Sequence, residues 1–325
     1  MITDHPFPSA DIEREALAAI GAQLVVGRCR EVTEVIDLAR DADGVLVTYA
    51  PVTREVVEAL ARCKIVARMG IGLDNVDVAA ATARGIVVTN VPDYCVDEVS
   101  DHALALLLGC VRRLRQLDQS VRAGQWDFRP YRPIPRIRGK VIGLVGFGKI
   151  ARAMARKCQG LSMQVAAFDP YIAPDIVRSQ GVVPMRSLEE LLRESDFVSV
   201  HVPLGPETRG LLGEAEFAMM KQGAVLVNTA RAEIVDEEAL AEALASGRLT
   251  AAGLDVIVNP RADHPLLAFP GVLVSPHAAF FSEEATEELQ TRAVSDVVRV
   301  LTGGLPLNPV NPEVLATVEP KTTGG

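Results

Sequence analysis

Short apolar runs alternate with amphipathic segments along most of the chain. In the first part, runs rich in Val and Ile occupy residues 24–26, 44–49, 64–69 and 85–90, and helical patterns separate them. Strand, helix and strand at this spacing predict a parallel sheet with helices on both faces. We therefore expect a small doubly wound unit, whose opening strand would be the very short segment 1–3.

A second and stronger series of apolar runs occupies residues 141–147, 164–169, 196–203, 223–230, 250–256 and 271–277. This series predicts a parallel sheet of six strands. Between the two series, residues 100–117 begin apolar nearly all round, as suits a helix buried between domains. The Pro-rich stretch 126–140 should be an extended connection, because proline interrupts helices.

After the second series, residues 282–301 form a single amphipathic pattern, and this helix could return the chain to the first domain. The polar tail from Thr317 is expected to be disordered.

Length and composition restrict the class of protein. The 325 residues suit two domains, and 49% hydrophobic with 23% charged residues is the balance of a globular protein. A net charge of −9 without a basic run argues against nucleic-acid binding. The longest apolar stretch, 103–111, is about half of the roughly 20 residues that cross a bilayer.

Compartment and metal content follow from two further features. The N-terminal segment lacks a basic region followed by an apolar one, so we expect a cytoplasmic protein. The five cysteines show no CxxC spacing, which argues against a disulfide framework and a zinc site, and we expect no metal.

The most specific motif is GLVGFGKIA at residues 143–151, between a Val-rich strand and a helical pattern. Read as GxGxxA, it gives Gly146 the tight turn, Gly148 the close approach of a pyrophosphate, and Ala151 the helix packing. Asp169 ends the next strand 21 residues after Gly148, where a carboxylate can accept from a ribose 2′-OH. Because that carboxylate would repel a 2′-phosphate, we predict binding of NAD rather than NADP.

Hydride transfer to a carbonyl needs a proton donor, and histidine suits neutral pH. Of five histidines, His277 ends the last strand of the second series, where ligands bind in open α/β sheets. His201 more plausibly lines the adenosine side. Arg231 follows another strand, and its guanidinium could hold a carboxylate bidentately. The plainer alternatives are a loop histidine and a helix-capping arginine.

In the first series, residues 68–75 (RMGIGLDN) form a Gly-rich turn after a strand. Its backbone N–H groups could receive an anionic group, with the charge of Arg68 nearby. A tight turn with a salt-bridged arginine carries comparable weight.

Together these residues resemble the D-isomer-specific 2-hydroxyacid dehydrogenase family, and within it the C-terminal binding protein branch. The resemblance rests on VPDYCVDEVSDHALAL, IRGKVIGLVGFGKIA, FDPY, VNTARAEIVDEEALAEAL, GLDV and SPHAAFFSEEA. It implies an α/β fold of two doubly wound parallel-sheet domains. A flavodoxin-like substrate-binding domain would comprise residues 1–99 and 286–325, and a Rossmann NAD-binding domain residues 100–285. It also implies a homodimer formed largely through the NAD domains.

The resemblance implies roles for individual residues. In the family pattern the arginine of NTAR binds substrate and the histidine of PH is the acid/base, here Arg231 and His277, while Asp255 would contact the nicotinamide side. The residues expected to bind the coenzyme are Gly146, Phe147, Gly148, Lys149, Ile150, Asp169, His201, Val202, Pro203, Thr208, Thr229, Ala230 and Asp255. Those expected to bind substrate are Arg68, Gly70, Ile71, Gly72, Tyr49 and Phe280, the last standing where C-terminal binding protein has Trp.

One departure concerns the catalytic histidine. The family usually continues LDV into Glu-Pro, and the glutamate hydrogen-bonds that histidine; this chain reads LDVIVNPRADHPLL, with Asn259 before the proline. A carboxylate there would raise the pKa of His277 by roughly 1 to 3 units. Asn259 could still orient the ring, and Asp263 is the nearby carboxylate that could substitute.

The leading hypothesis is an NAD(H)-dependent oxidoreductase that moves a hydride to or from C2 of a small 2-keto or D-2-hydroxy acid. The absent Glu-Pro motivates a rival, an NAD(H)-responsive regulatory protein with vestigial catalysis. A third reading is oxidation of a nonstandard hydride donor such as phosphite.

Overall fold

The computed structural model describes residues 1–317. The part of the predicted disordered tail after Thr317 lies outside the described residues. The chain divides into two compact units, one made of residues 1–94 with those from Ser282 onward, the other of Cys95–Phe281. The sequence placed these divisions at 99/100 and 285/286. No helix of the described part is long and apolar enough to cross a membrane.

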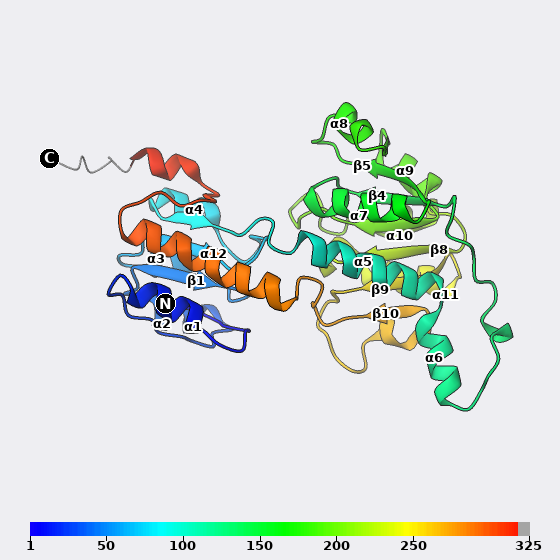
Figure 1. Cartoon of the computed structure of the whole chain (residues 1–325), viewed down its shortest axis with the longest axis horizontal. Helices are drawn as coiled ribbons and strands as arrows, with labels where there is room; N and C mark the ends of the chain where they lie inside the picture. Colours follow the sequence, from blue (N-terminus) through cyan, green and yellow to red (C-terminus); the bar gives the residue numbers. More distant parts are fainter. Residues whose placement is uncertain (318–325) are drawn as a thin grey trace. The chain divides into compact units, whose positions relative to one another are not determined.

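The first unit is a three-stranded parallel sheet in the order β1-β2-β3 with helices around it (Figure 1). Its strands are β1 (Gly44–Val47), β2 (Ile65–Arg68) and β3 (Val87–Thr89). Its helices are α1 (Asp11–Ala18), α2 (Val32–Ala39), α3 (Arg54–Ala59), α4 (Val78–Ala83) and α12 (Glu283–Leu301), followed by the 3-10 turn η4 (Pro312–Thr317). All three strands are buried throughout, as expected of a parallel sheet covered on both faces.

Two predicted strands of the first unit are wrong. Residues 1–3 and 24–26 contribute isolated bridges only, in which Ile2 pairs with Val26 and with Leu46. Val25 and Val26 are exposed by 48% and 40%, so residues 24–26 are apolar without being buried like a strand of the sheet.

The second unit is a seven-stranded parallel sheet in the order β10-β9-β8-β7-β4-β5-β6. Its strands are β4 (Val141–Val145), β5 (Gln164–Phe168), β6 (Val183–Pro184), β7 (Phe197–Val200), β8 (Ala224–Asn228), β9 (Leu249–Leu254) and β10 (Val272–Val274). Six strands were predicted. The seventh strand, β6, was not predicted because no apolar run marks it in the sequence. It is two residues long, lies at an edge of the sheet and leaves Val183 56% exposed.

Helices cover both faces of this sheet (Figure 1). They are α5 (Val96–Val111), α6 (Leu114–Arg122), α7 (Lys149–Gly160), α8 (Pro174–Ser179), α9 (Leu188–Glu194), α10 (Glu214–Met219) and α11 (Glu237–Ala245), with 3-10 turns η1 (Arg129–Tyr131), η2 (Ala232–Ile234) and η3 (Pro265–Ala268). One core cluster joins α5, α7 and α8 to the sheet, and a second joins α9, α10 and α11 to its other face. The strand order reverses between β4 and β7, which is where α/β sheets of this kind bind ligands.

The segment after α12 completes the first unit by covering the free edge of β3. Val310 N donates to Val88 O at 2.8 Å, and the buried Asn311 accepts from Val88 N through Oδ1 at 2.7 Å. Asn311 Nδ2 donates to Ile86 O and to Thr82 Oγ1, both at 2.9 Å. One amide therefore satisfies backbone and side-chain groups that would otherwise be buried without partners.

We predict that Asn311→Ala lowers the free energy of unfolding by about 2 kcal/mol, because it leaves buried donors and acceptors unsatisfied. Urea unfolding followed by circular dichroism measures the change. Asn308→Ala is the matched control, since Asn308 is only partly buried and makes no side-chain hydrogen bond in the described part of the chain. Equal midpoints for the two variants would contradict the prediction.

Candidate active site

The glycine-rich loop follows β4 at the switch point of the sheet. Gly146 has φ 90°, and a Cβ there would lie 2.9 Å from Val202 Cγ1 and 3.0 Å from the His201 carbonyl oxygen. Gly148 is the N-cap of α7, caps it with no side chain, and has nothing within 4 Å of its would-be Cβ. The space beside Gly148 at the start of α7 is therefore open, and a helix N-terminus of this kind can receive a pyrophosphate.

Asp169 ties this loop to the next strand end. It directly follows β5, and its Oδ2 accepts from Phe147 N at 2.8 Å while Oδ1 accepts from Tyr171 N at 2.9 Å. The hydroxyl of Tyr171 donates to Glu207 Oε2 at 2.6 Å, and that hydrogen bond raises the pKa of Tyr171. Two carboxylates therefore lie at the edge where a ribose would bind, which disfavours a further phosphate there.

The loop after β7 carries the remaining residues predicted for the adenosine side. The ring of His201 accepts from or donates to Ser199 Oγ at 2.9 Å, and its burial lowers the pKa of His201 to about 4 although part of the residue reaches the surface. This imidazole is therefore neutral near pH 7. The hydroxyl of Thr208 accepts from Gly205 N at 2.8 Å and donates to Pro203 O at 2.6 Å, so it closes its own loop.

The turn after β8 positions Arg231. The buried Asn228 accepts from Ala230 N through Oδ1 at 2.9 Å and donates through Nδ2 to Arg231 O at 2.8 Å. Arg231 Nη1 donates to Ala230 O at 2.9 Å. Asn228 was not among the predicted site residues, although it stands inside the NTAR motif and the sequence alone could have indicated it.

Thr229, in the same turn, shows whether the carboxyl edge of the sheet could bind a coenzyme. Its Oγ1 is buried and has no hydrogen-bond partner within the described residues. A buried hydroxyl is rarely left without one. The residues present therefore fit the nicotinamide dinucleotide that the Gly-rich loop and Asp169 predict.

Asp255 and His277 meet at the end of β9 and β10. Register pairs Asn228 of β8 with Leu254 of β9 and Leu254 with Val274 of β10, so the loops after all three strands leave one edge. Asp255 is 1% exposed and its carboxylate accepts three hydrogen bonds from the loop that carries His277. The rings of His277 and Phe280 pack edge to face at 6.1 Å.

Two residues that the sequence offered as partners of His277 lie on the surface. Asn259 is exposed, with φ 47°, and Asp263 pairs with Arg261 at 2.9 Å. Neither makes a hydrogen bond to His277 within the described part of the chain. The described residues contain no cluster of His, Cys, Asp or Glu that could hold a metal ion.

The predicted substrate residues of the first unit lie at the carboxyl edge of its own sheet. Arg68 ends β2, is 7% exposed and donates from Nη1 to Met69 O at 3.1 Å. A Cβ on Gly70, whose φ is 145°, would overlap that guanidinium, so only glycine fits. Asn90 Nδ2 holds the turn through Ile71 O at 2.7 Å, and Gly72 follows it.

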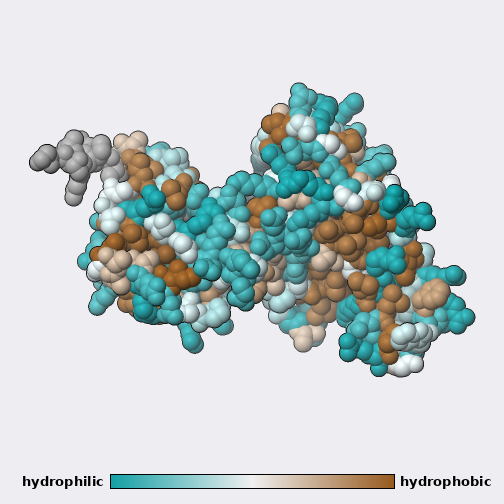
Figure 2. Space-filling view, in the orientation of Figure 1, coloured by the Kyte–Doolittle hydropathy of each residue, from teal (hydrophilic) through white to brown (hydrophobic). Residues whose placement is uncertain are grey.

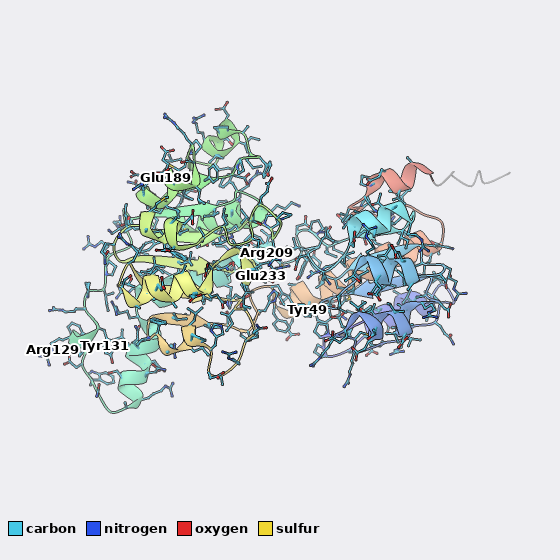
Figure 3. All side chains as sticks on the ribbon, turned by 180° about the vertical axis from the view of Figure 1, so that it is seen from behind. Tyr49, Arg129, Tyr131, Glu189, Arg209 and Glu233 are labelled. Atoms are coloured by element: carbon cyan, nitrogen blue, oxygen red, sulfur yellow. The ribbon has the colours of Figure 1, made fainter. Side chains whose placement is uncertain are left out.

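Tyr49, in the loop after β1, is 47% exposed and is drawn with its neighbours in Figure 3. Its N–H donates to Asp4 Oδ2 at 2.6 Å, and Thr48 N donates to Asp4 Oδ1 at 3.0 Å. Asp4 was missed by sequence reasoning because it lies 45 residues before Tyr49 in the chain.

We predict that Gly148→Ala leaves thermal stability unchanged but raises the Kd for NADH at least tenfold. The new methyl meets no protein atom within 4 Å, so any cost arises on the coenzyme side. Gly160→Ala, at the other end of α7 and equally unobstructed, is the matched control and should bind NADH like the wild type. Fluorescence titration gives the Kd; identical values for both variants would contradict the prediction.

Residues 104–279 match the family model "D-isomer specific 2-hydroxyacid dehydrogenase, NAD binding domain". The D-3-phosphoglycerate dehydrogenase of Methanocaldococcus jannaschii is 37% identical over 86% of this chain and 53% of its own length. The glyoxylate reductase of Korarchaeum cryptofilum is 38% identical over 88% of both chains. The chain thus spans about half the length of the phosphoglycerate dehydrogenases that it matches.

Solved structures of related enzymes have the same fold as this chain. D-lactate dehydrogenase from Aquifex aeolicus, complexed with NAD and lactic acid, superposes with a TM-score of 0.87 at 26% identity, over 95% of this chain and 98% of that one. Glyoxylate reductase from Paecilomyes thermophila gives 0.86 at 28% identity, over 96% and 98%. These likenesses confirm the predicted α/β fold with two parallel sheets, but none of the relatives named is a C-terminal binding protein. The chain belongs to the D-isomer-specific 2-hydroxyacid dehydrogenase family.

Proposed function

We propose that this chain catalyses NAD(H)-dependent hydride transfer at C2 of a small 2-keto or D-2-hydroxy acid. The observation that carries the proposal is the common edge of β4, β8 and β10, from which the glycine loop, Arg231 and His277 all project. Bound NADH would supply the hydride. The likeness to glyoxylate reductase, which spans 88% of both chains, favours a small keto acid such as glyoxylate or hydroxypyruvate.

Arg231 and His277 would divide the work on the substrate. The guanidinium would hold the substrate carboxylate and polarise the neighbouring carbonyl. As the hydride reaches C2, the carbonyl oxygen takes up negative charge, and the His277 imidazolium would donate a proton to it. In the reverse direction the neutral imidazole would remove the hydroxyl proton. His201 is an unsuitable acid because its pKa is lowered to about 4.

The residues of the first unit would help to hold the substrate carboxylate. Gly70 leaves room for the Arg68 guanidinium across the turn at residues 70–72, and backbone N–H groups there suit an anion. Tyr49 would face the variable part of the keto acid.

In one alternative, NADH binding regulates the protein and catalysis is vestigial. Asn259 in place of the family glutamate is the feature that favours it. The relatives named above are enzymes by name, which favours catalysis.

We predict that His277→Ala lowers kcat for the best keto acid by about 10² to 10⁴ while the Kd for NADH changes by less than about threefold, because general acid catalysis is lost but the coenzyme loop is intact. Arg231→Lys should raise KM and lower kcat, since a lysine cannot hold the carboxylate bidentately. NADH oxidation over a panel of glyoxylate, hydroxypyruvate, 3-phosphohydroxypyruvate and phenylpyruvate measures both.

Arg248→Lys, at the opposite edge of the sheet, is the matched control and should keep wild-type kinetics. Wild-type protein that binds NADH tightly but turns over none of these acids would favour the regulatory alternative. Turnover that survives His277→Ala would assign the proton to another group.

A homodimer is the assembly that we propose. Four large apolar side chains are exposed close together in sequence, on α6 and the residues after it: Leu114 by 57%, Val121 by 46%, Trp126 by 90% and Phe128 by 61%. This segment extends beyond the sheet of the second unit, where Arg129 and Tyr131 are labelled in Figure 3, and hydrophobic surface lies beside it in Figure 2. Clustered exposed apolar groups of this size mark an interaction surface, and a second copy is the partner that the family implies.

We predict a dimer by light scattering after size exclusion, and dissociation to monomers in the double variant Trp126→Lys, Phe128→Lys, because charge cannot be buried there. Tyr171→Lys, which changes an aromatic residue that is 79% exposed and lies outside this segment, is the control and should remain dimeric. A wild-type monomer would contradict the proposal.

A further inference from the structure

We propose that His102, Ser275 and Asp255 form a positioning network that holds the His277 loop in its catalytic conformation. The inference rests on the proposed role of His277 as the acid/base. None of the three would touch the reacting atoms through this network; they would act through the loop backbone. His102 and Ser275 were not among the site residues predicted from the sequence.

The loop needs such support because its backbone is strained. His277 has φ 54°, in the left-handed region that non-glycine residues rarely adopt. Conformations of this kind persist only where the surroundings enforce them. The enforcing contacts begin on the backbone itself, where His277 N donates to Asp255 O at 2.8 Å and to Ser275 O at 3.1 Å.

The carboxylate of Asp255 supplies the next layer. Its Oδ1 accepts from Ala278 N at 2.9 Å and from Ser275 Oγ at 2.6 Å, and its Oδ2 accepts from Ala279 N at 2.9 Å. The side chain is fully buried. A buried carboxylate with three donors is a charge-assisted anchor, and its donors lie on both sides of His277 in sequence.

His102 extends the network from the loop to α5. Its Nε2 lies 2.7 Å from Ser275 Oγ and 3.6 Å from Asp255 Oδ1. Because the Ser275 hydroxyl donates its one proton to Asp255, it must accept from His102, which assigns the His102 proton to Nε2. The helix itself is firmly held, since α5 packs on α7, β8 and β9 through buried Ala103, Leu106 and Leu107.

Asn259, which stands where the family has glutamate, is not part of this network. Asn259 and Asp263 are exposed and make no hydrogen bond to His277 within the described residues. Asp255 is instead the buried carboxylate of this loop. It fixes the backbone from which the imidazole projects.

The test compares Ser275→Ala with Ser275→Thr. Removing the hydroxyl should lower kcat about tenfold, the effect of one lost hydrogen bond to a charged group, and leave the Kd for NADH within about twofold. Threonine retains the hydroxyl and should restore kcat to within about threefold of wild type. His102→Gln, which keeps an N–H donor the same number of bonds from Cβ but on a flexible chain in place of a rigid ring, should fall between the two. Ser246→Ala, an exposed serine at the end of α11, is the control and should match wild type.

Hydrogen exchange of the peptide spanning residues 275–281 provides a readout independent of turnover. Ser275→Ala should speed exchange of the Ala278 and Ala279 amides at least tenfold, with the peptides of α5 and α7 unchanged. If no keto acid is turned over, the proposed function fails. The hydrogen-exchange rates of the Ala278 and Ala279 amides then test the proposed network on their own. Unchanged exchange in Ser275→Ala, or an equal loss of activity in Ser275→Thr, would overturn the inference.

Discussion

Hydrogen bonds from loop N–H groups to short polar side chains at strand ends determine the geometry of both units. A loop that leaves a parallel sheet loses the ladder partners of its backbone, and those groups must be satisfied in another way. Asp169 does this for the glycine loop, Asn228 for the turn before Arg231, and Asp255 for the loop of His277. In the first unit Asp4 holds the loop of Tyr49 in the same manner.

This constraint also has an electrostatic side. A buried carboxylate is costly unless hydrogen bonds compensate for its lost hydration. Asp255 is fully buried and accepts three hydrogen bonds, so the charge and the loop stabilise each other. A neutral amide at residue 255 would turn an acceptor into a donor facing other donors. The anchor is therefore specific to a carboxylate, whereas the surrounding apolar core tolerates exchange among residues of similar volume.

Strands were predicted correctly from the sequence where burial on both faces gives a continuous apolar run. The Val-rich runs of β4, β7 and β8 are buried on both faces, so period and composition mark them, and the chemistry-bearing residues that follow them could be predicted with them. Prediction failed at β6, whose two residues lie at an exposed edge, and at residues 24–26, which form only a bridge. Ser275 and His102 stand 173 residues apart, and nothing local in either segment indicates that they meet.

The loop after β9 shows why Asn259, in place of the family glutamate, leaves the orientation of His277 to other residues. Glu237 begins α11, where the helix dipole favours its charge, and it accepts from Val258 N at 2.8 Å and lies 3.2 Å from His264 Nε2. These bonds anchor the loop at both ends to a helix, and Asn259 between them is left exposed in a left-handed conformation that asparagine tolerates better than glutamate does. Because the loop is held in this way, a longer acidic side chain at residue 259 could approach His277 only with backbone strain and with loss of hydration of its carboxylate. Orientation of the imidazole through the backbone, from Asp255, carries neither cost.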